Sequence, residues 1–291
     1  MVSEGDQMIT AYRIILLLTL TLVVSASPAV ALAQVDQQAL ARAIAGDDRR
    51  AAQEAFDEAT RALAPEEMGP ELRAALIAAL ERQNEAYQAS METATTREAL
   101  SPRPSTINRS RLVFWGEGYG FVIEAVAALR DPQAIPALVG ALGTGWTATR
   151  AVAAFGEEAG SLVLSLAEGG DLRADQMTSA MSTLSLMIQE PQGPPLSLRT
   201  KERARRLVEQ KLASGPDHPG FGPDTSALQD FVLQQAISLA IALDDPPLRE
   251  LVTSLARDPD AVRRLGVEDS SAVERVQRHA AEALAKPPRR R

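Results

Sequence analysis

An internal repeat restricts the fold of this chain more than any other feature. The segment at 125–129, AVAAL, returns as AVAAF at 151–155, 26 residues later. In each copy a short turn leads into a second apolar segment, 134–142 in the first copy and 159–164 in the second. Units of this size cannot bury an apolar face alone, so consecutive units must stack on one another. The sequence therefore predicts a series of helix–turn–helix units.

The turn between the two helices of a unit has its own chemistry. Asp131 can accept hydrogen bonds from the free N–H groups at the start of the second helix, and Pro132 occupies the first turn, where no N–H is needed. The same pair of residues recurs later in the chain, as Asp245-Pro246 and Asp258-Pro259. We therefore predict a helix start at each of these three pairs.

The segment before the repeat also has helical spacing. Ala52, Phe56, Ala59 and Leu63 follow one another at intervals of four, three and four residues, which places them on one helix face. Asp47 is predicted to cap this helix. No segment shows the alternation of a half-buried strand, and a core poor in aromatics (4%) is typical of packed helices. The sequence predicts an all-α fold.

A change in composition separates two helical parts. Serine and proline interrupt the apolar pattern after residue 93, and the repeat begins shortly afterwards. The predicted division is a signal peptide at 1–33, an N-terminal helical segment at 34–93, a linker or long loop at 94–113, the repeat region at 114–285 and a basic tail at 286–291.

The stretch at 122–138, VIEAVAALRDPQAIPAL, resembles a HEAT repeat of the short, phycobilisome-lyase-like type. That type has an alanine-rich helix, a turn ending in Asp-Pro and a second helix that opens with Ile-Pro-Ala-Leu. The resemblance is clearest over 121–168. It implies a right-handed α-solenoid with an extended concave face, of the kind that serves as a docking surface for proteins. The lyase name of some relatives refers to chromophore attachment, for which these residues give no specific sign.

The N-terminal residues are typical of an export signal. Residues 14–24, IILLLTLTLVV, form an apolar stretch too short to span comfortably a hydrocarbon core of about 30 Å. Ala31 and Ala33 supply small residues where a signal peptidase needs them, so cleavage is expected between Ala33 and Gln34. Initiation at Met8 would remove two acidic residues from the start of the signal. An uncleaved anchor or a buried helix is the alternative.

Charge and cysteine content exclude several classes of protein. A net charge of −8 argues against nucleic-acid binding, and the absence of cysteine excludes disulfides, thiolate metal sites and a lipoprotein anchor. His218 lies in a Pro- and Gly-rich loop with Asp217 and Asp224, where we expect a mobile loop and not a metal site. No serine motif suggests a nucleophile with its base. We predict no catalytic residue, cofactor or metal.

Aromatic residues gather where the repeat region begins. Phe114, Trp115, Tyr119 and Phe121 lie within eight residues, and Trp146 follows in the next turn. Such rings either pack the edge of a repeat or form a binding hot spot. The predicted partner-binding residues are Phe114, Trp115, Tyr119 and Trp146.

Two basic segments, 199–211 and the tail at 286–291, are either solvated surfaces or sites for an acidic partner or an anionic envelope surface. From these features we expect an exported, non-enzymatic scaffold or adaptor that binds other proteins in the periplasm or outside a bacterial cell. Membrane contact is expected only through the signal peptide or the basic tail. The alternatives are an enzyme subunit with an unrecognised site, or a module that binds envelope glycan or lipid through Trp115, Trp146 and the tail.

Overall fold

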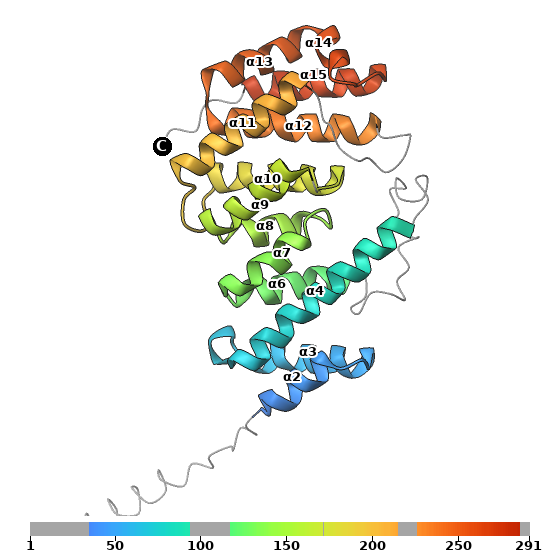
Figure 1. Ribbon diagram of the computed structural model, residues 1–291, viewed down its shortest axis with the longest axis vertical. Coiled ribbons are helices and arrows are strands. Elements are labelled where there is room, and N and C mark those ends of the chain that lie inside the picture. Colours follow the sequence, from blue (N-terminus) through green and yellow to red (C-terminus); the bar gives the residue numbers. More distant parts are fainter. Residues whose placement is uncertain (1–34, 94–116, 171, 215–225, 286–291) are drawn as a thin grey trace, which may run out of the picture. The chain divides into compact units, whose positions relative to one another are not determined.

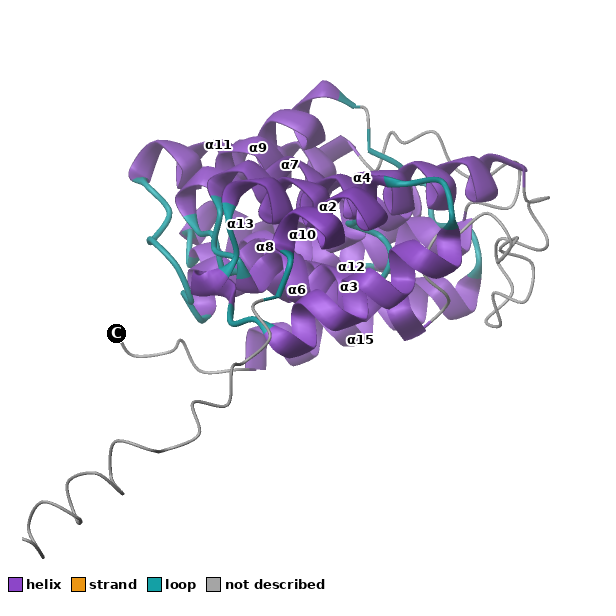
Figure 2. Cartoon of the chain, turned by 90° about the horizontal axis from the view of Figure 1, so that it is seen from below, coloured by secondary structure: helices purple, strands orange, loops and turns teal. Residues whose placement is uncertain are grey.

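Helices follow one another along the described chain, separated by turns and loops, and some of them begin at an aspartate cap. The computed structural model describes residues 35–93, 117–170, 172–214 and 226–285 (Figure 1). These residues form 13 α-helices and two short 3₁₀ helices and no strand (Figure 2). The predicted all-α class is confirmed for this part of the chain.

The helices have the following bounds: α2 (Gln37–Ala45), α3 (Arg49–Ala62), α4 (Pro70–Thr93), α6 (Glu117–Ala128), α7 (Ile135–Gly140), α8 (Trp146–Ala153), α9 (Glu157–Gly169), α10 (Ala174–Gln189), α11 (Leu198–Ser214), α12 (Ser226–Leu243), α13 (Pro246–Arg257), α14 (Pro259–Arg264) and α15 (Ser270–Ala285), with 3₁₀ helices η1 (Pro65–Glu67) and η3 (Pro132–Ala134). None of them is long and apolar enough to cross a membrane.

The predicted aspartate caps are present. The side chain of Asp131 accepts a hydrogen bond from the Gln133 N–H at 2.9 Å and begins η3, the turn that leads into α7. Asp245 and Asp258 likewise cap α13 and α14, and a proline follows each of them. The prediction for α3 is wrong by one residue: Asp48, not Asp47, accepts the hydrogen bonds at its start.

Helices in this array contact their neighbours in chain order. One series of contacts runs from α4 to α6, α8, α10, α12 and α15, and a second series runs from α7 to α9, α11 and α13. The two series are joined by contacts such as α6 with α7, α8 with α9 and α12 with α13. The labels of Figure 1 follow this order. Each helix therefore buries its apolar face against elements close to it in the sequence.

The N-terminal helices join the repeat region through α4, which contacts both α6 and α7. The buried amide of Asn84 on α4 donates a hydrogen bond to the Ala137 carbonyl on α7 at 2.7 Å and accepts one from the Tyr119 hydroxyl on α6. Arg73 also reaches the Leu129 carbonyl. The linker predicted at 94–113 lies outside the described residues, but the helices on either side of it pack together.

The turn between α8 and α9 is unusually tight. Gly156 has φ 60° and ψ −130°, and the Glu157 N–H that follows it donates a hydrogen bond to the Pro194 carbonyl at 3.1 Å. A side chain at Gly193 would meet the Ala154 carbonyl oxygen at 2.4 Å. The backbone of the loop that leads into α11 therefore packs directly on the backbone of this turn.

Candidate functional site

Half of the predicted partner-binding residues lie outside the described part of the chain. These two residues are Phe114 and Trp115. The predicted cleavage residues Ala33 and Gln34 also lie outside the described part of the chain. The loop that contains His218 and the basic tail at 286–291 also lie outside it. Of the four predicted partner-binding residues, the structure therefore places Tyr119 and Trp146.

Tyr119 is buried, with 7% of its surface exposed. Its ring packs against Tyr87 of α4, with ring centroids 5.8 Å apart, and its hydroxyl donates to Asn84. Burial raises the pKa of the Tyr119 phenol well above its ordinary value, so the hydroxyl stays protonated as a donor. The position of Tyr119 fits the packing interpretation of the aromatic group and not a contact surface.

Trp146 is exposed over 60% of its surface and is the first residue of α8. Gly145 before it has φ 141°, a conformation that favours glycine and sets the direction of the helix start. Gly120 of α6 lies close to the neighbouring Thr147, because a Cβ added there would be 3.8 Å from the threonine hydroxyl. The segments that carry Trp146 and Phe121 are therefore side by side.

Phe121 is 45% exposed, although its ring also packs edge to face on the buried Phe56 at a centroid distance of 5.8 Å. A ring fixed on one side and open on the other can contact a partner at little cost in side-chain entropy. We call Phe121 and Trp146 the aromatic surface. Phe121 belongs to the aromatic cluster seen in the sequence but is not among the four predicted binding residues.

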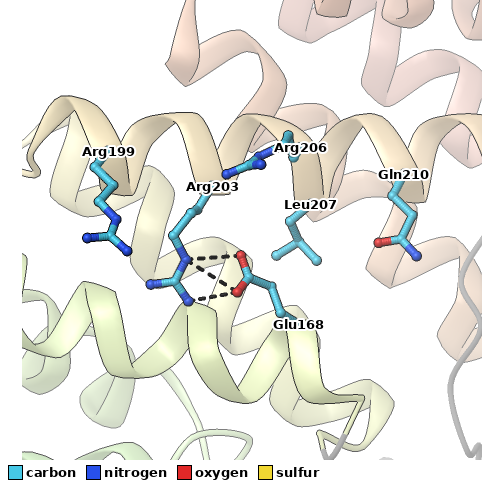
Figure 3. A pocket seen from close by; sticks show the side chains of 6 residues that line it. All are labelled: Glu168, Arg199, Arg203, Arg206, Leu207 and Gln210. Carbon is cyan, nitrogen blue, oxygen red and sulfur yellow. Dashed lines mark hydrogen bonds and ion pairs between the residues drawn. The ribbon is translucent and has the colours of Figure 1, made fainter.

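A second candidate site is a groove between α9 and α11 with a volume of about 460 Å³ (Figure 3). We call it the arginine groove; its lining residues are Glu168, Arg199, Arg203, Arg206, Leu207 and Gln210. Arg203 binds the Glu168 carboxylate through Nη2 at 2.7 Å and through Nε at 3.1 Å, and its Nη2 also donates to Ser165. The hydrogen bond from Arg203 lowers the pKa of Glu168, and the charge of Arg206 contributes to this shift. The carboxylate therefore stays ionised at neutral pH.

A serine on α12 and a histidine on α15 are in contact. This pair was not predicted from the sequence. Ser238 Oγ lies 2.8 Å from His279 Nε2 and also donates to the Gln234 carbonyl at 3.0 Å. Which of the two groups donates the hydrogen bond depends on the tautomer of the histidine ring. The contact joins α12 to α15.

Asp230 of α12 is fully buried and is bound at 2.8 Å by Nε of Arg275 from α15. Its other oxygen, Oδ1, has no hydrogen-bond partner among the described residues. Burial raises the pKa of Asp230 above its ordinary 3.8, although the hydrogen bond from Arg275 acts in the opposite direction. A buried carboxylate that is only half satisfied opposes folding when it is ionised.

Changing Asp230 to asparagine is expected to alter the pH dependence of stability. A carboxyl with a raised pKa binds its proton more tightly in the folded state, so the contribution of Asp230 to the stability of the wild type falls as pH rises through that pKa. The amide that replaces the carboxyl has no such titration. The free energy of unfolding of D230N, relative to the wild type, should therefore be higher at about pH 7 than at about pH 3, measured by urea denaturation.

The comparison of the two pH values is its own control, because the titration of every other carboxyl is common to both proteins. If the free energies of unfolding of D230N and the wild type differ by the same amount at both pH values, ionisation of Asp230 does not destabilise the folded state.

No group of three or more His, Cys, Asp or Glu residues that could hold a metal ion occurs in the described segments. No family model matches the chain, and no curated protein or solved structure matches it either. The interpretation of the site therefore depends on its geometry alone.

Proposed function

We propose that this chain is an exported, non-enzymatic scaffold of HEAT-like repeats, arranged as a right-handed α-solenoid, that binds another protein. The observation that carries the proposal is the order of helix contacts. Each of α6, α8 and α10 contacts the next helix of the series α6, α8, α10 and α12, and α7, α9, α11 and α13 contact one another in the same stepwise way. Stacked helix pairs that contact only their neighbours are typical of solenoids, and solenoids present extended binding faces.

Two successive units support the HEAT-like assignment. The helices α6 and α7 are joined through the Asp131 cap and Pro132, and α8 and α9 through the tight turn at Gly156. These pairs coincide with the region 121–168, where the sequence resemblance is clearest. The shared arrangement supports one repeated unit with two different turns.

The aromatic surface is the proposed contact with the partner. Trp146 and Phe121 are large side chains exposed on neighbouring helices of adjacent units. Tryptophan is over-represented among the residues that dominate binding energy at interfaces. Export is proposed from the apolar segment 14–24 and the small residues at Ala31 and Ala33.

A photo-crosslinking amino acid at position 146 should join the chain to one defined protein in an envelope extract of the source cell. The matched control carries the same amino acid at Glu282, an exposed position of α15 far along the chain. Trp146→Ala should weaken capture of that protein by tenfold or more, because a hot-spot truncation costs about 2 kcal/mol or more.

The exported form should begin at Gln34 on N-terminal sequencing.

Equal crosslinking from positions 146 and 282, or capture that is unchanged by Trp146→Ala, would contradict a specific protein contact at the aromatic surface. Recovery of this chain from the envelope fraction with residues 1–33 still attached would contradict cleavage of the signal.

A further inference from the structure

One face of α11 carries a stripe of cationic and amide side chains. Arg199, Arg203, Arg206 and Gln210 follow at intervals of four, three and four residues, which is the spacing of one helix face. All four line the arginine groove, opposite Glu168 of α9 (Figure 3). The stripe from Arg199 to Arg206 covers seven residues, or about 10.5 Å along the helix axis.

The positive charge of this groove is only partly neutralised. Glu168 pairs with Arg203, whereas neither Arg199 nor Arg206 forms an ion pair within 4.0 Å with any described residue. Arg205, which is not among the lining residues, pairs with Glu202 and Glu209. Two of the three arginines in the groove therefore have no carboxylate of a described residue bound to them, although the charges of Glu168 and Glu202 act on Arg206 from further away. These two arginines are notable in a chain whose net charge is −8.

The other groups in and beside the groove indicate what it can accommodate. Leu207 lines the groove but is only 3% exposed and so offers a ligand little apolar surface, and Gln210 adds an amide at one end. At the other end Leu198, the first residue of α11, is 86% exposed. Guanidinium groups bind carboxylates through two parallel hydrogen bonds, and an apolar neighbour favours a peptide over a free anion.

We propose that the arginine groove binds an extended acidic segment of a protein partner, with two carboxylates about 10 Å apart on Arg199 and Arg206. In an extended polyproline II segment, which has three residues per turn and a rise of about 3.1 Å per residue, residues three apart lie on the same side about 9 Å from each other, close to the spacing of the two arginines. The proposal rests on the protein-binding function and adds to it the chemistry of the bound segment.

The test uses the full mature chain and short fluorescent peptides, with binding measured by fluorescence anisotropy at low and high salt. The first peptide carries glutamates three residues apart with leucine between them, the second has glutamine in place of every glutamate, and the third has the same composition with its glutamates adjacent. The groove variant is Arg199→Gln with Arg206→Gln, which leaves the Arg203–Glu168 pair intact. The matched control is Arg150→Gln with Arg278→Gln, two exposed arginines outside the groove.

The spaced peptide should bind best, and its affinity should fall about tenfold in the groove variant and stay within about twofold in the control, because each exposed ion pair contributes up to about 1 kcal/mol. Binding should weaken with added salt. Equal loss in both variants, or equal binding of the glutamine peptide, would overturn the proposal. Binding of vesicles with anionic lipid or of inorganic phosphate through these arginines, without binding of the spaced peptide, would also overturn it.

The two proposals fail in different ways. Peptide binding in the groove without a crosslinked partner at position 146 would contradict the aromatic contact but support the groove. A crosslinked partner whose capture is insensitive to the groove variant, with no peptide bound, would keep the scaffold function and overturn the acidic-segment inference.

Discussion

Replacing Gly156 by alanine should lower the free energy of unfolding by about 3 kcal/mol, because two penalties act at one position. Its backbone lies at φ 60° and ψ −130°, a combination open mainly to glycine. An added Cβ would also stand 2.0 Å from the carbonyl oxygen of Pro194, a backbone atom that cannot rotate away. The variant must therefore either distort the α8–α9 turn or push away the loop before α11.

Gly170→Ala is the matched control for this prediction. Gly170 also has a positive φ, 77°, but nothing lies within 4 Å of a Cβ added there. It should cost only about 1–2 kcal/mol, the usual penalty for the left-handed conformation. Equal losses for the two variants in urea denaturation would show that the contact with Pro194 adds nothing.

Replacing Asn84 by leucine should destabilise the chain by about 2–3 kcal/mol, since it removes a buried amide that serves two other helices. The Tyr119 hydroxyl would lose its acceptor inside the protein, and the Ala137 carbonyl would keep only its hydrogen bond from Ala141. The added volume would also press on Gly140, which already lies close to the Asn84 amide. Thermal and urea unfolding of the purified variant would measure the loss.

Tyr119→Phe alone should cost about 1 kcal/mol, because it removes only one hydroxyl of the network. Combined with Asn84→Leu, it removes the unsatisfied hydroxyl, so the double variant should lose less than the sum of the two single losses. Strictly additive losses would show that Asn84 and Tyr119 do not depend on each other.

Local features of the fold were predictable from the sequence, whereas contacts between distant residues were not. Asp131, Asp245 and Asp258 begin helices as predicted because a cap depends on the few residues that follow it. The choice between Asp47 and Asp48 failed because two adjacent aspartates can cap the same helix, and only the backbone geometry of Asp48 decides between them.

The candidate sites show the same division. The basic character of 199–211 was visible in the sequence, but its ion pair with Glu168 joins residues 35 apart on different helices. Tyr119 was one of the predicted partner-binding residues, with packing as the alternative, and its packing on Tyr87 and its hydrogen bond to Asn84 show that it is buried. The hydrogen bond between Ser238 and His279 spans 41 residues and has no local pattern that would predict it.

Glu157, the first residue of α9, fixes the position of α11. Its carboxylate accepts hydrogen bonds from the Ser197 N–H and hydroxyl and from the Thr200 hydroxyl, at distances of 2.7, 2.9 and 2.6 Å. Although burial acts to raise the pKa of Glu157, the hydrogen bonds from Thr200 and Ser197 lower it, so the carboxylate stays ionised at neutral pH. With Arg203 bound to Glu168 further along, α9 and α11 are joined at two points. The two helices that form the arginine groove are thus held together before any ligand arrives, so binding there loses little entropy in bringing them into place.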